Sequence, residues 1–249
     1  MRGPHNFWRL IKTGATFERT GSMNVAMEAL SAPDSLKIFS KVLVLPFKYF
    51  GLKGDPDQPP ILRALTALGP AYIKFGQLLS TRPDVVGQDL ANELKVLQDA
   101  LPPFSQKIAI ETIEKELSCK VDEIFSNFSD PVAAASLAQV HKATVRNTGE
   151  IVAVKVLRPG VEKAFLKDVD AFYLLAKIIE LFSKSSRRLK PVAVIEHFEG
   201  IVREELDLRM EVSAAAEFKS NTQNDDKFIV PAVSWELSSR RVLTTEWVS

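Results

Sequence analysis

The sequence has one cysteine, three histidines and no glycine-rich phosphate motif of the GxGxxG type. A single cysteine, Cys119, cannot form an intrachain disulfide, and it argues against a thiolate metal site, as is typical of a reducing compartment. The histidines stand at positions 5, 141 and 197, too far apart in the sequence to indicate a metal cluster. We therefore expect neither a disulfide framework nor a protein-ligated metal.

The sequence also lacks a large excess of positive or negative charge. The 32 Lys and Arg residues nearly balance the 31 Asp and Glu residues, so the net charge is +1. This balance offers no case for nucleic acid as a partner. The N-terminal 53 residues are less even, because eight basic residues there face three acidic ones, a net charge of +5. The sequence therefore predicts a weakly basic N-terminal region.

Long apolar runs are absent near the N-terminus. The start, MRGPHNFWRLIK, has no apolar core followed by small residues, so we predict no signal peptide. The longest early apolar stretch, Ile38 to Phe50, spans 13 residues, is interrupted by Lys41, Pro46 and Lys48, and is too short to cross a bilayer. Its pattern favours an amphipathic helix that packs on its own domain over one that lies on a membrane surface.

With 249 residues, of which 46% are hydrophobic, the chain can bury a sizeable core in one or two domains. Its first 120 residues favour helices. After the turn-rich GLKGDPDQPP at 51–60, apolar residues recur at helical spacing over 61–86, with a break at Gly69-Pro70. Further helices are predicted over Ala91–Ala100 and over Ser105–Leu117, the latter with Ser105 as N-cap.

Two polar residues interrupt the mainly apolar helix that follows the break. Lys74 and Gln77 are three residues apart and share one helix face. Two interpretations remain open: a polar partner elsewhere in the fold, or a solvated stripe on an amphipathic helix.

A small antiparallel sheet is predicted from about Val121 onward. The runs VDEIFSNF, SLAQVHKATV and EIVAVKVL are short, rich in β-branched or aromatic residues, and separated by turn signals. Lys155 lies in the last of these runs, where a buried charge needs a carboxylate or a phosphate. The alternative is a lysine whose stem follows the sheet edge and whose ammonium group reaches water.

Two long helices and a strand pair are predicted beyond this sheet. Val161 to Lys184 is almost wholly apolar in its middle and indicates a buried helix, and another helix runs from Pro191 to about Ser220. On an ideal helix, Glu204, Asp207 and Glu211 line one face, whereas Glu205 points away from them. Finally, FIVPAVSW and RRVLTTEWV are typical of two paired strands.

Four motifs in this order resemble one family. They are KFGQ at 74–77, AAAS at 133–136 followed by QVH, VAVK at 152–155, and ELD at 205–207 with Glu211 four residues later. From about residue 60 to its end, the chain resembles the N-terminal portion, through the hinge, of the UbiB/Coq8 family, also called ABC1 or ADCK atypical kinases. The resemblance implies an α+β fold: a protein-kinase-like N-lobe, with a small antiparallel sheet and an αC-type helix, preceded by a helical KxGQ extension. We accordingly divide the chain into 1–58, 59–120 and 121–249.

The resemblance also implies roles for individual residues. Lys155 would bind nucleotide phosphates and form an ion pair with Glu211. The KxGQ residues Lys74 and Gln77 would contact Glu205 and Asp207. Because an ideal helix places these two acids far apart, either the helix bends there or only one acid meets Lys74. The remaining nucleotide-binding positions would be the loop Ala133, Ala134, Ala135 and Ser136, which replaces a glycine-rich loop, and the hinge Thr245, Glu246, Trp247 and Val248.

In kinase-like domains, the catalytic-loop Asp and Asn and the metal-binding Asp come after the hinge, in the C-lobe. Because this sequence stops at Ser249, we expect the C-lobe to be absent, the chain to be a fragment, and the chain by itself to be inactive. The cofactor implied is ATP or ADP with Mg²⁺, and the metal ligands would belong to the missing C-lobe.

The resemblance implies an ATP-binding atypical kinase or ATPase that supports ubiquinone biosynthesis, a type often labelled 2-polyprenylphenol 6-hydroxylase. The partners expected are nucleotide, prenylated quinone precursors, the enzymes of that synthesis and a membrane surface, with a peripheral location on the cytoplasmic side of the inner membrane. A homodimer is compatible with the sequence but not required by it. The alternative function is a non-catalytic scaffold or lipid-binding module formed by the helical N-terminal half.

Overall fold

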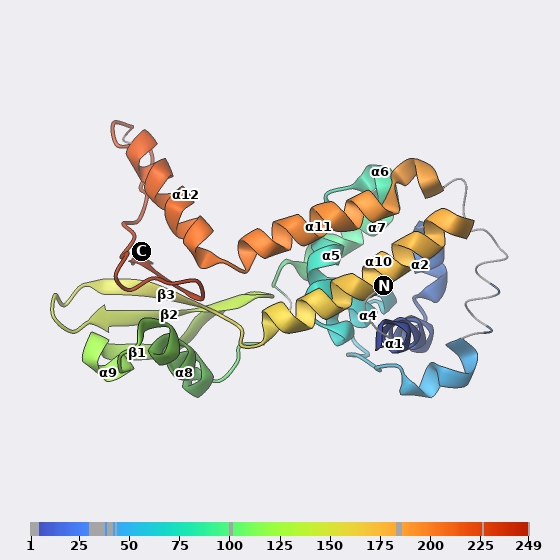
Figure 1. Ribbon diagram of the computed structural model, residues 1–249, viewed down its shortest axis with the longest axis horizontal. Helices are drawn as coiled ribbons and strands as arrows, with labels where there is room; N and C mark the ends of the chain where they lie inside the picture. The colour runs from blue at the N-terminus through green and yellow to red at the C-terminus, as the bar shows by residue number, and fades with distance from the viewer. Residues whose placement is uncertain are drawn as a thin grey trace. The chain divides into compact units, whose positions relative to one another are not determined.

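The computed structural model describes residues 5–29, 38, 42, 44–99, 102–182, 186–225 and 227–248. Contacts divide the chain into two compact units that alternate along the sequence (Figure 1). The helical unit comprises Met1–Ala100 and Lys163–Gly200, and the sheet unit comprises Leu101–Glu162 and Ile201–Ser249. The three divisions predicted from the sequence run linearly, whereas each of these units combines two separate stretches of chain.

The helical unit contains the helices predicted for the first 100 residues, whereas the helix predicted over Ser105–Leu117 belongs to the sheet unit. Gly69 has a φ angle of 107°, which separates two helices at the predicted position and leaves Pro70 in the first turn of the second. The predicted buried helix from Val161 is confirmed as far as Phe182, whereas Lys184 lies outside the described residues. The elements are α1 (His5–Thr20), α2 (Met23–Ala29), η1 (Leu45–Phe50), α4 (Pro60–Leu68), α5 (Pro70–Ser80), α6 (Pro83–Val86), α7 (Gln88–Leu94), η2 (Lys95–Asp99), most of α10 (Val161–Phe182), η3 (Ser186–Leu189) and most of α11 (Pro191–Glu205).

An aromatic cluster forms part of the interior of the helical unit. Tyr72 and Phe75 of α5 contact Phe172 of α10, with ring centroids 4.8 and 5.2 Å apart, respectively. Phe75 also lies 5.2 Å from Phe198 of α11. These rings join α5 to two helices that lie much later in the sequence, and such contacts add to the burial of apolar area.

Of the stretch from Ile38 to Phe50, predicted as an amphipathic helix, residues 39–41 and 43 lie outside the described residues. Its end forms the short helix η1, which packs on α1: Arg19 donates to the carbonyls of Tyr49 and Gly51, at 2.8 and 2.6 Å. None of the described helices is both long and apolar enough to span a bilayer.

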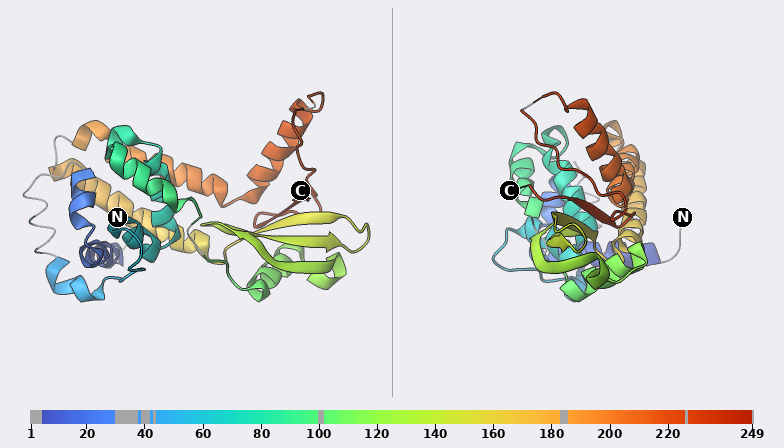
Figure 2. Two further views of the ribbon diagram at one scale, coloured as in Figure 1. Left: turned by 180° about the vertical axis from the view of Figure 1, so that it is seen from behind. Right: turned by 90° about the vertical axis from the view of Figure 1, so that its left-hand side faces the viewer.

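The sheet unit contains one antiparallel sheet, with strand order β1-β2-β3-β4. Its hydrophobic face is covered by α8, whose Ala109 and Ile113 pack on Val152, Val154 and Val156 of β3. Only the start of α12 lies against the opposite face, and the helix then extends away from the sheet, as Figures 1 and 2 both show. This arrangement confirms the predicted α+β fold class. The elements are α8 (Gln106–Leu117), α9 (Val121–Ile124), β1 (Phe125–Ala134), β2 (Ala138–Val145), β3 (Ile151–Leu157), α12 (Leu208–Asn221) and β4 (Val242–Glu246).

The prediction of one continuous helix from Pro191 to about Ser220 was wrong. The chain leaves the helical conformation at Asp207, which has φ −127° and ψ 93°, and α12 begins at Leu208. The Asp207 carboxylate accepts the Arg209 backbone N–H and caps the new helix, while the Leu208 N–H donates to the Arg240 carbonyl. The ideal-helix alignment of Glu204, Asp207 and Glu211 on one face is therefore lost.

Two strand predictions also need correction. Residues 121–124 form the helical turn α9, because the Glu123 carboxylate accepts the Lys120 N–H at the helix start, and β1 begins only at Phe125. The run FIVPAVSW is not a strand. It carries a single bridge, between Val233 and Thr245, because Pro231 has no N–H to donate and a turn begins at Trp235.

Candidate nucleotide-binding site

Lys155 and Glu211 form the ion pair predicted from the sequence. The Lys155 ammonium donates to both Glu211 carboxylate oxygens, at 2.9 and 2.7 Å. The lysine comes from the middle of β3, and the glutamate from the first turn of α12, on the face of the sheet opposite α8. Both side chains keep partial contact with solvent, 32% for Lys155 and 47% for Glu211, so a ligand can reach the pair.

The strand register brings the alanine segment onto the face that carries Lys155. Val140 of β2 lies directly opposite Lys155, and Ala133 of β1 lies opposite Val140. Residues paired in this way point to the same side of a sheet. On the other side of β3, Leu243 of β4 completes the row. The face toward α12 therefore carries one cation in an otherwise apolar row, bordered by the alanine segment.

The loop after the alanines is held by its own backbone and by an arginine that the sequence reasoning did not single out. The Ala135 N–H donates to the Ala138 carbonyl at 2.8 Å, which closes a tight turn. Arg158 donates its backbone N–H to the Leu137 carbonyl, and its guanidinium lies over the Phe104 ring, 5.4 Å from the centroid. Partial burial lowers the Arg158 pKa from its usual range. Arg158 follows directly after the apolar strand, but nothing in that pattern indicated a contact with the loop.

Ser136, predicted as a donor to nucleotide, lies within this turn and is only 6% exposed. Its neighbours Ala133 and Ala135 are exposed. The loop thus presents backbone and methyl groups to solvent more readily than the Ser136 hydroxyl. The role of the serine remains a prediction.

The segment predicted as the hinge is the end of β4 and the two residues after it. The Glu246 N–H donates to the Ala232 carbonyl at 2.8 Å, and the Trp247 N–H donates to the Ile151 carbonyl at 3.1 Å. Thr245 lies opposite Ala153 and shares the face of Lys155, and the Lys142 ammonium lies over the Trp247 ring at 4.8 Å. These two N–H groups already have partners. The groups of this segment that are left for the predicted contacts with adenine are therefore its carbonyls and the N–H of Val248.

A family model described as the ABC1 atypical kinase-like domain matches residues 96–249. The chain belongs to this family. It is 41% identical over 221 residues to a protein of Marinobacter nauticus named "Probable protein kinase UbiB", covering 86% of this chain and 39% of the relative. A protein of the same name from Pseudomonas putida is 45% identical over 184 residues, covering 74% of this chain and 34% of the relative. The chain thus spans little more than a third of the length of these UbiB relatives.

A solved structure also resembles this member of the ABC1 family. The complex of Rv3197 with erythromycin from Mycobacterium tuberculosis matches with a TM-score of 0.52 and 27% identity, covering 73% of this chain and 45% of that one. This resemblance supports the α+β, kinase-like fold.

The KFGQ residues of this ABC1 chain lie in α5 of the helical unit. Gln77 donates its side-chain amide to the Leu97 carbonyl at 2.8 Å. A Cβ atom at Gly76 would lie 2.4 Å from a Leu97 methyl carbon, so this glycine allows η2 to approach α5 closely. Because Lys74 and Gln77 belong to the helical unit and Glu205 and Asp207 to the sheet unit, the predicted contact between these two pairs remains a prediction.

A cavity of about 440 Å³ lies inside the helical unit. Its wall is almost entirely aliphatic and aromatic and includes Phe7, Leu90 and Ile179. The few polar side chains in the wall include Thr13 and Tyr72, whose hydroxyls are 2.6 Å apart and hydrogen-bond to each other. Phe7 is 52% exposed, so the cavity wall extends to the surface at α1. Within the described residues, no group of three or more His, Cys, Asp or Glu side chains is placed to hold a metal ion.

Proposed function

We propose that this chain provides the nucleotide-binding lobe of an ATP-binding atypical kinase or ATPase that supports ubiquinone biosynthesis. The observation that carries the proposal is the Lys155–Glu211 ion pair, in which one carboxylate holds the ammonium with both oxygens. A lysine held in this way is the pairing that kinase-like phosphate sites require. Membership of the ABC1 family and the UbiB names of its relatives support the same function.

The residues on this face fit the phosphate groups of ATP or ADP. Lys155 supplies a partly exposed positive charge, and the turn at Ala135 lies at the end of the adjoining strands. A positive charge beside the backbone of a tight turn is a common environment for phosphate. We place the adenine at Thr245–Val248, whose carbonyls and Val248 N–H would pair with it.

Mg²⁺ neutralises phosphate charge in such reactions. In this proposal, its ligands come from the part of the longer UbiB relatives that follows the hinge. Lys155 then orients the phosphates, and Glu211 holds the lysine in place.

Titration of the 249-residue chain with MgATP tests the proposed site. Lys155→Ala removes the charge that meets the phosphates, so we expect affinity to fall by at least about tenfold, the range for a lost charge-assisted bond. Lys115→Ala is the matched control, because Lys115 is an exposed lysine on α8, the helix that covers the opposite face. Isothermal titration calorimetry measures both variants, and circular dichroism confirms that they fold. Equal affinities of Lys155→Ala and wild type would rule out this site.

The physiological part of the proposal is tested in a bacterium that encodes the protein. The Lys155→Ala change is introduced into the chromosomal gene, and ubiquinone is quantified by mass spectrometry beside a Lys115→Ala strain. We expect ubiquinone to fall only in the Lys155→Ala strain. Normal ubiquinone in a strain whose purified protein has lost MgATP binding would favour a scaffold role over nucleotide turnover.

A second candidate function, lipid binding by the helical unit, is favoured by the apolar cavity. Its volume of about 440 Å³ lies within the range of small-molecule sites. Because its polar hydroxyls are paired with each other, the cavity suits an aliphatic or prenyl chain more than a polar ligand. In this alternative, the chain of a prenylated quinone precursor occupies the cavity and its phenol ring remains nearer the surface.

Binding of a short-chain prenylated phenol, measured by calorimetry, tests the cavity. Ala26 is part of the wall, so Ala26→Leu fills space and should weaken binding about tenfold, as expected for one to two displaced methylene contacts. Ala193→Leu adds the same volume at an exposed position of α11 and should leave binding unchanged. Identical affinities of the Ala26→Leu and Ala193→Leu variants would exclude the cavity as the binding site. MgATP affinity should be unaffected in both.

A further inference from the structure

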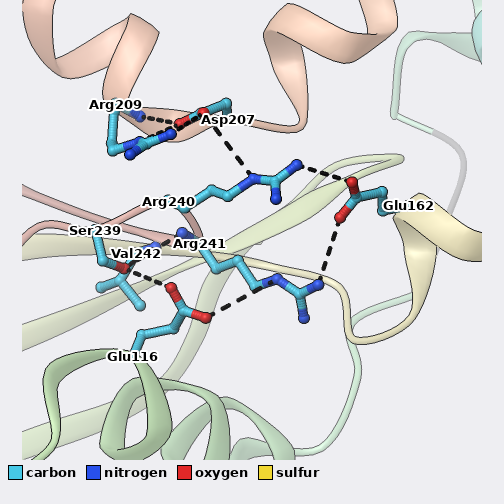
Figure 3. A network of polar contacts seen from close by, with 8 residues as sticks. All are labelled: Glu116, Glu162, Asp207, Arg209, Ser239, Arg240, Arg241 and Val242. Carbon is cyan, nitrogen blue, oxygen red and sulfur yellow. Dashed lines mark hydrogen bonds and ion pairs between the residues drawn. The ribbon is translucent and has the colours of Figure 1, made fainter.

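Arg240 and Arg241, immediately before β4, lie at the centre of a polar network in the sheet unit (Figure 3). Through their backbone, these two residues contact both elements of the candidate site. The Leu208 N–H, the first of α12, donates to the Arg240 carbonyl at 2.9 Å. The Leu157 N–H, the last of β3, donates to the Arg241 carbonyl at 3.0 Å. One dipeptide therefore contacts the helix that carries Glu211 and the strand that carries Lys155.

The side chain of Arg240 extends these contacts to two carboxylates. Its guanidinium donates to Glu162 Oε1 at 2.8 Å, and its Nε lies 3.9 Å from Asp207 Oδ2. Asp207 is the N-cap of α12 and is also held by two hydrogen bonds from the Arg209 guanidinium, at 2.8 and 2.6 Å. These contacts lower the Asp207 pKa, with the Arg209 hydrogen bond as the main cause. Asp207 therefore stays ionised, as a cap and an arginine partner require.

Arg241 connects the same network to the other face of the sheet. Its guanidinium lies 3.5 Å from Glu162 Oε2 and 4.0 Å from Glu116 Oε1 of α8. Ser239 donates to the second Glu116 oxygen at 3.0 Å and accepts the Val242 N–H at 3.2 Å. Three guanidinium groups and three carboxylates thus balance in charge across α8, α10, α12 and the start of β4.

The exposure of these groups indicates a role in geometry more than in stability. Arg240 is 47% exposed and Glu162 is 31% exposed. Ion pairs with this much solvent contribute little to the free energy of unfolding. Paired guanidinium and carboxylate groups nevertheless impose a defined orientation. Glu211 is four residues after Asp207, in the first turn of α12, so a shift of the helix start moves Glu211 directly.

We propose that Arg240 is a positioning residue for the nucleotide site: it fixes the start of α12 through Leu208 and Asp207, so that Glu211 meets Lys155. Glu162 is its counterpart, because it holds the Arg240 guanidinium on the side opposite Asp207. This inference rests on the proposed nucleotide-binding function and adds a means of regulating the same site. A ligand or modification that neutralises either partner would loosen the Lys155–Glu211 pair without touching it.

Two measurements on Arg240→Ala test the proposal. The first is MgATP affinity, which should fall about three- to tenfold, the range expected for coupling between neighbouring side chains. The second, independent of nucleotide, is hydrogen exchange of residues 208–212, which should become faster as the start of α12 loosens. Lys120→Ala is the control, since it removes an exposed ion pair with Glu114 in the same unit but outside the network. It should change neither measurement.

Double-mutant comparisons of MgATP affinity then distinguish a positioning role of Arg240 from a general structural effect. In an Glu211→Ala background, Arg240→Ala should cause no further loss of affinity, because the residue through which it acts is gone. Arg240→Glu combined with Glu162→Arg should recover part of the affinity lost by Arg240→Glu alone. The proposal is overturned if Arg240→Ala binds MgATP like wild type, even with faster exchange, or if its loss of affinity is as large in the Glu211→Ala background. A different result would contradict the proposed nucleotide site itself: MgATP affinity of the Lys155→Ala variant equal to that of the wild type.

Discussion

At the scale of single residues, Lys155 shows how a pattern with two interpretations is resolved by its partner. The sequence allowed either a lysine that extends to water or one held by an acid. The structure combines both features, because the ammonium is held by Glu211 while the side chain keeps 32% of its exposure. A partly exposed pair of this kind adds little to stability. Its placement supports the proposed role of Lys155 in binding phosphate.

His141 lies in the interior of the sheet unit, where its imidazole is favoured in the neutral form. It is fully buried, its Nδ1 lies 2.8 Å from the Ser129 carbonyl, and its Nε2 lies 2.9 Å from the Gln139 amide nitrogen. The carbonyl needs a donor, so Nδ1 carries the proton and Nε2 accepts from Gln139. The other end of the Gln139 amide is fixed, because its oxygen accepts the Phe104 N–H at 2.8 Å. Burial, the main cause, lowers the His141 pKa.

This lowered pKa predicts that stability depends on pH. Below the unfolded-state pKa of about 6.5, His141 binds a proton in the unfolded chain but not in the folded chain. The contribution of the neutral imidazole to the free energy of unfolding is therefore fully present above that pH and is lost as the pH falls. We expect the wild-type free energy of unfolding in urea to drop between pH 7.5 and 5.5. His141→Gln should be less stable at pH 7.5 but should show a smaller drop. His197→Gln, which changes an exposed histidine on α11, should keep the wild-type drop. Equal drops in all three proteins would contradict the assignment.

At the scale of elements, the break between α11 and α12 is the feature that helical periodicity did not reveal. Apolar and charged residues continue at helical spacing through Leu206 and Asp207, so periodicity alone predicts one helix. The break depends on a backbone acceptor, the Arg240 carbonyl, that is 32 positions away in the sequence. Tertiary contacts of this kind override local propensity, and they cannot be found in a local window.

Glycine supplies a prediction about how elements approach each other. At Gly51, a Cβ atom would lie 2.3 Å from the Ala15 carbonyl oxygen of α1, a backbone atom that cannot move away without displacing the helix. Gly51→Ala should therefore reduce the free energy of unfolding by about 1–3 kcal/mol, the usual cost of overpacking. Gly200→Ala is the matched control in the exposed part of α11. An added Cβ atom there has no described atom within 4 Å apart from its chain neighbours and the adjacent backbone of its own helix, so the change should increase stability by about 0.5–1 kcal/mol. Urea unfolding measures both, and a shift of the same sign would count against the close approach.

At the scale of the whole molecule, the sequence predicted what local patterns encode. The helical first part and the small sheet follow from periodicity and turn residues, and they are confirmed. The pairing of Lys155 with Glu211 was implied by the family resemblance, and the structure contains it. Arg158 at the alanine loop and Arg240 at the start of α12 were missed. Each is an arginine among 32 basic residues, and only the register of distant strands brings it to the site. The Thr245–Val248 segment and the contacts of Lys74 with Glu205 and Asp207 stay predictions.

The alternation of the two units along the chain has a consequence for synthesis. The two stretches of the helical unit are separated by residues 101–162, and the two stretches of the sheet unit are separated by residues 163–200. Each of these intervening segments must therefore form a loop before the two stretches of the other unit can pack together. Closing loops of this length is entropically costly and slows folding. Neither unit can therefore finish folding as its first stretch leaves the ribosome. The helical unit must wait for Gly200 and the sheet for β4, which leaves apolar surfaces in need of protection until nearly all of these 249 residues have emerged.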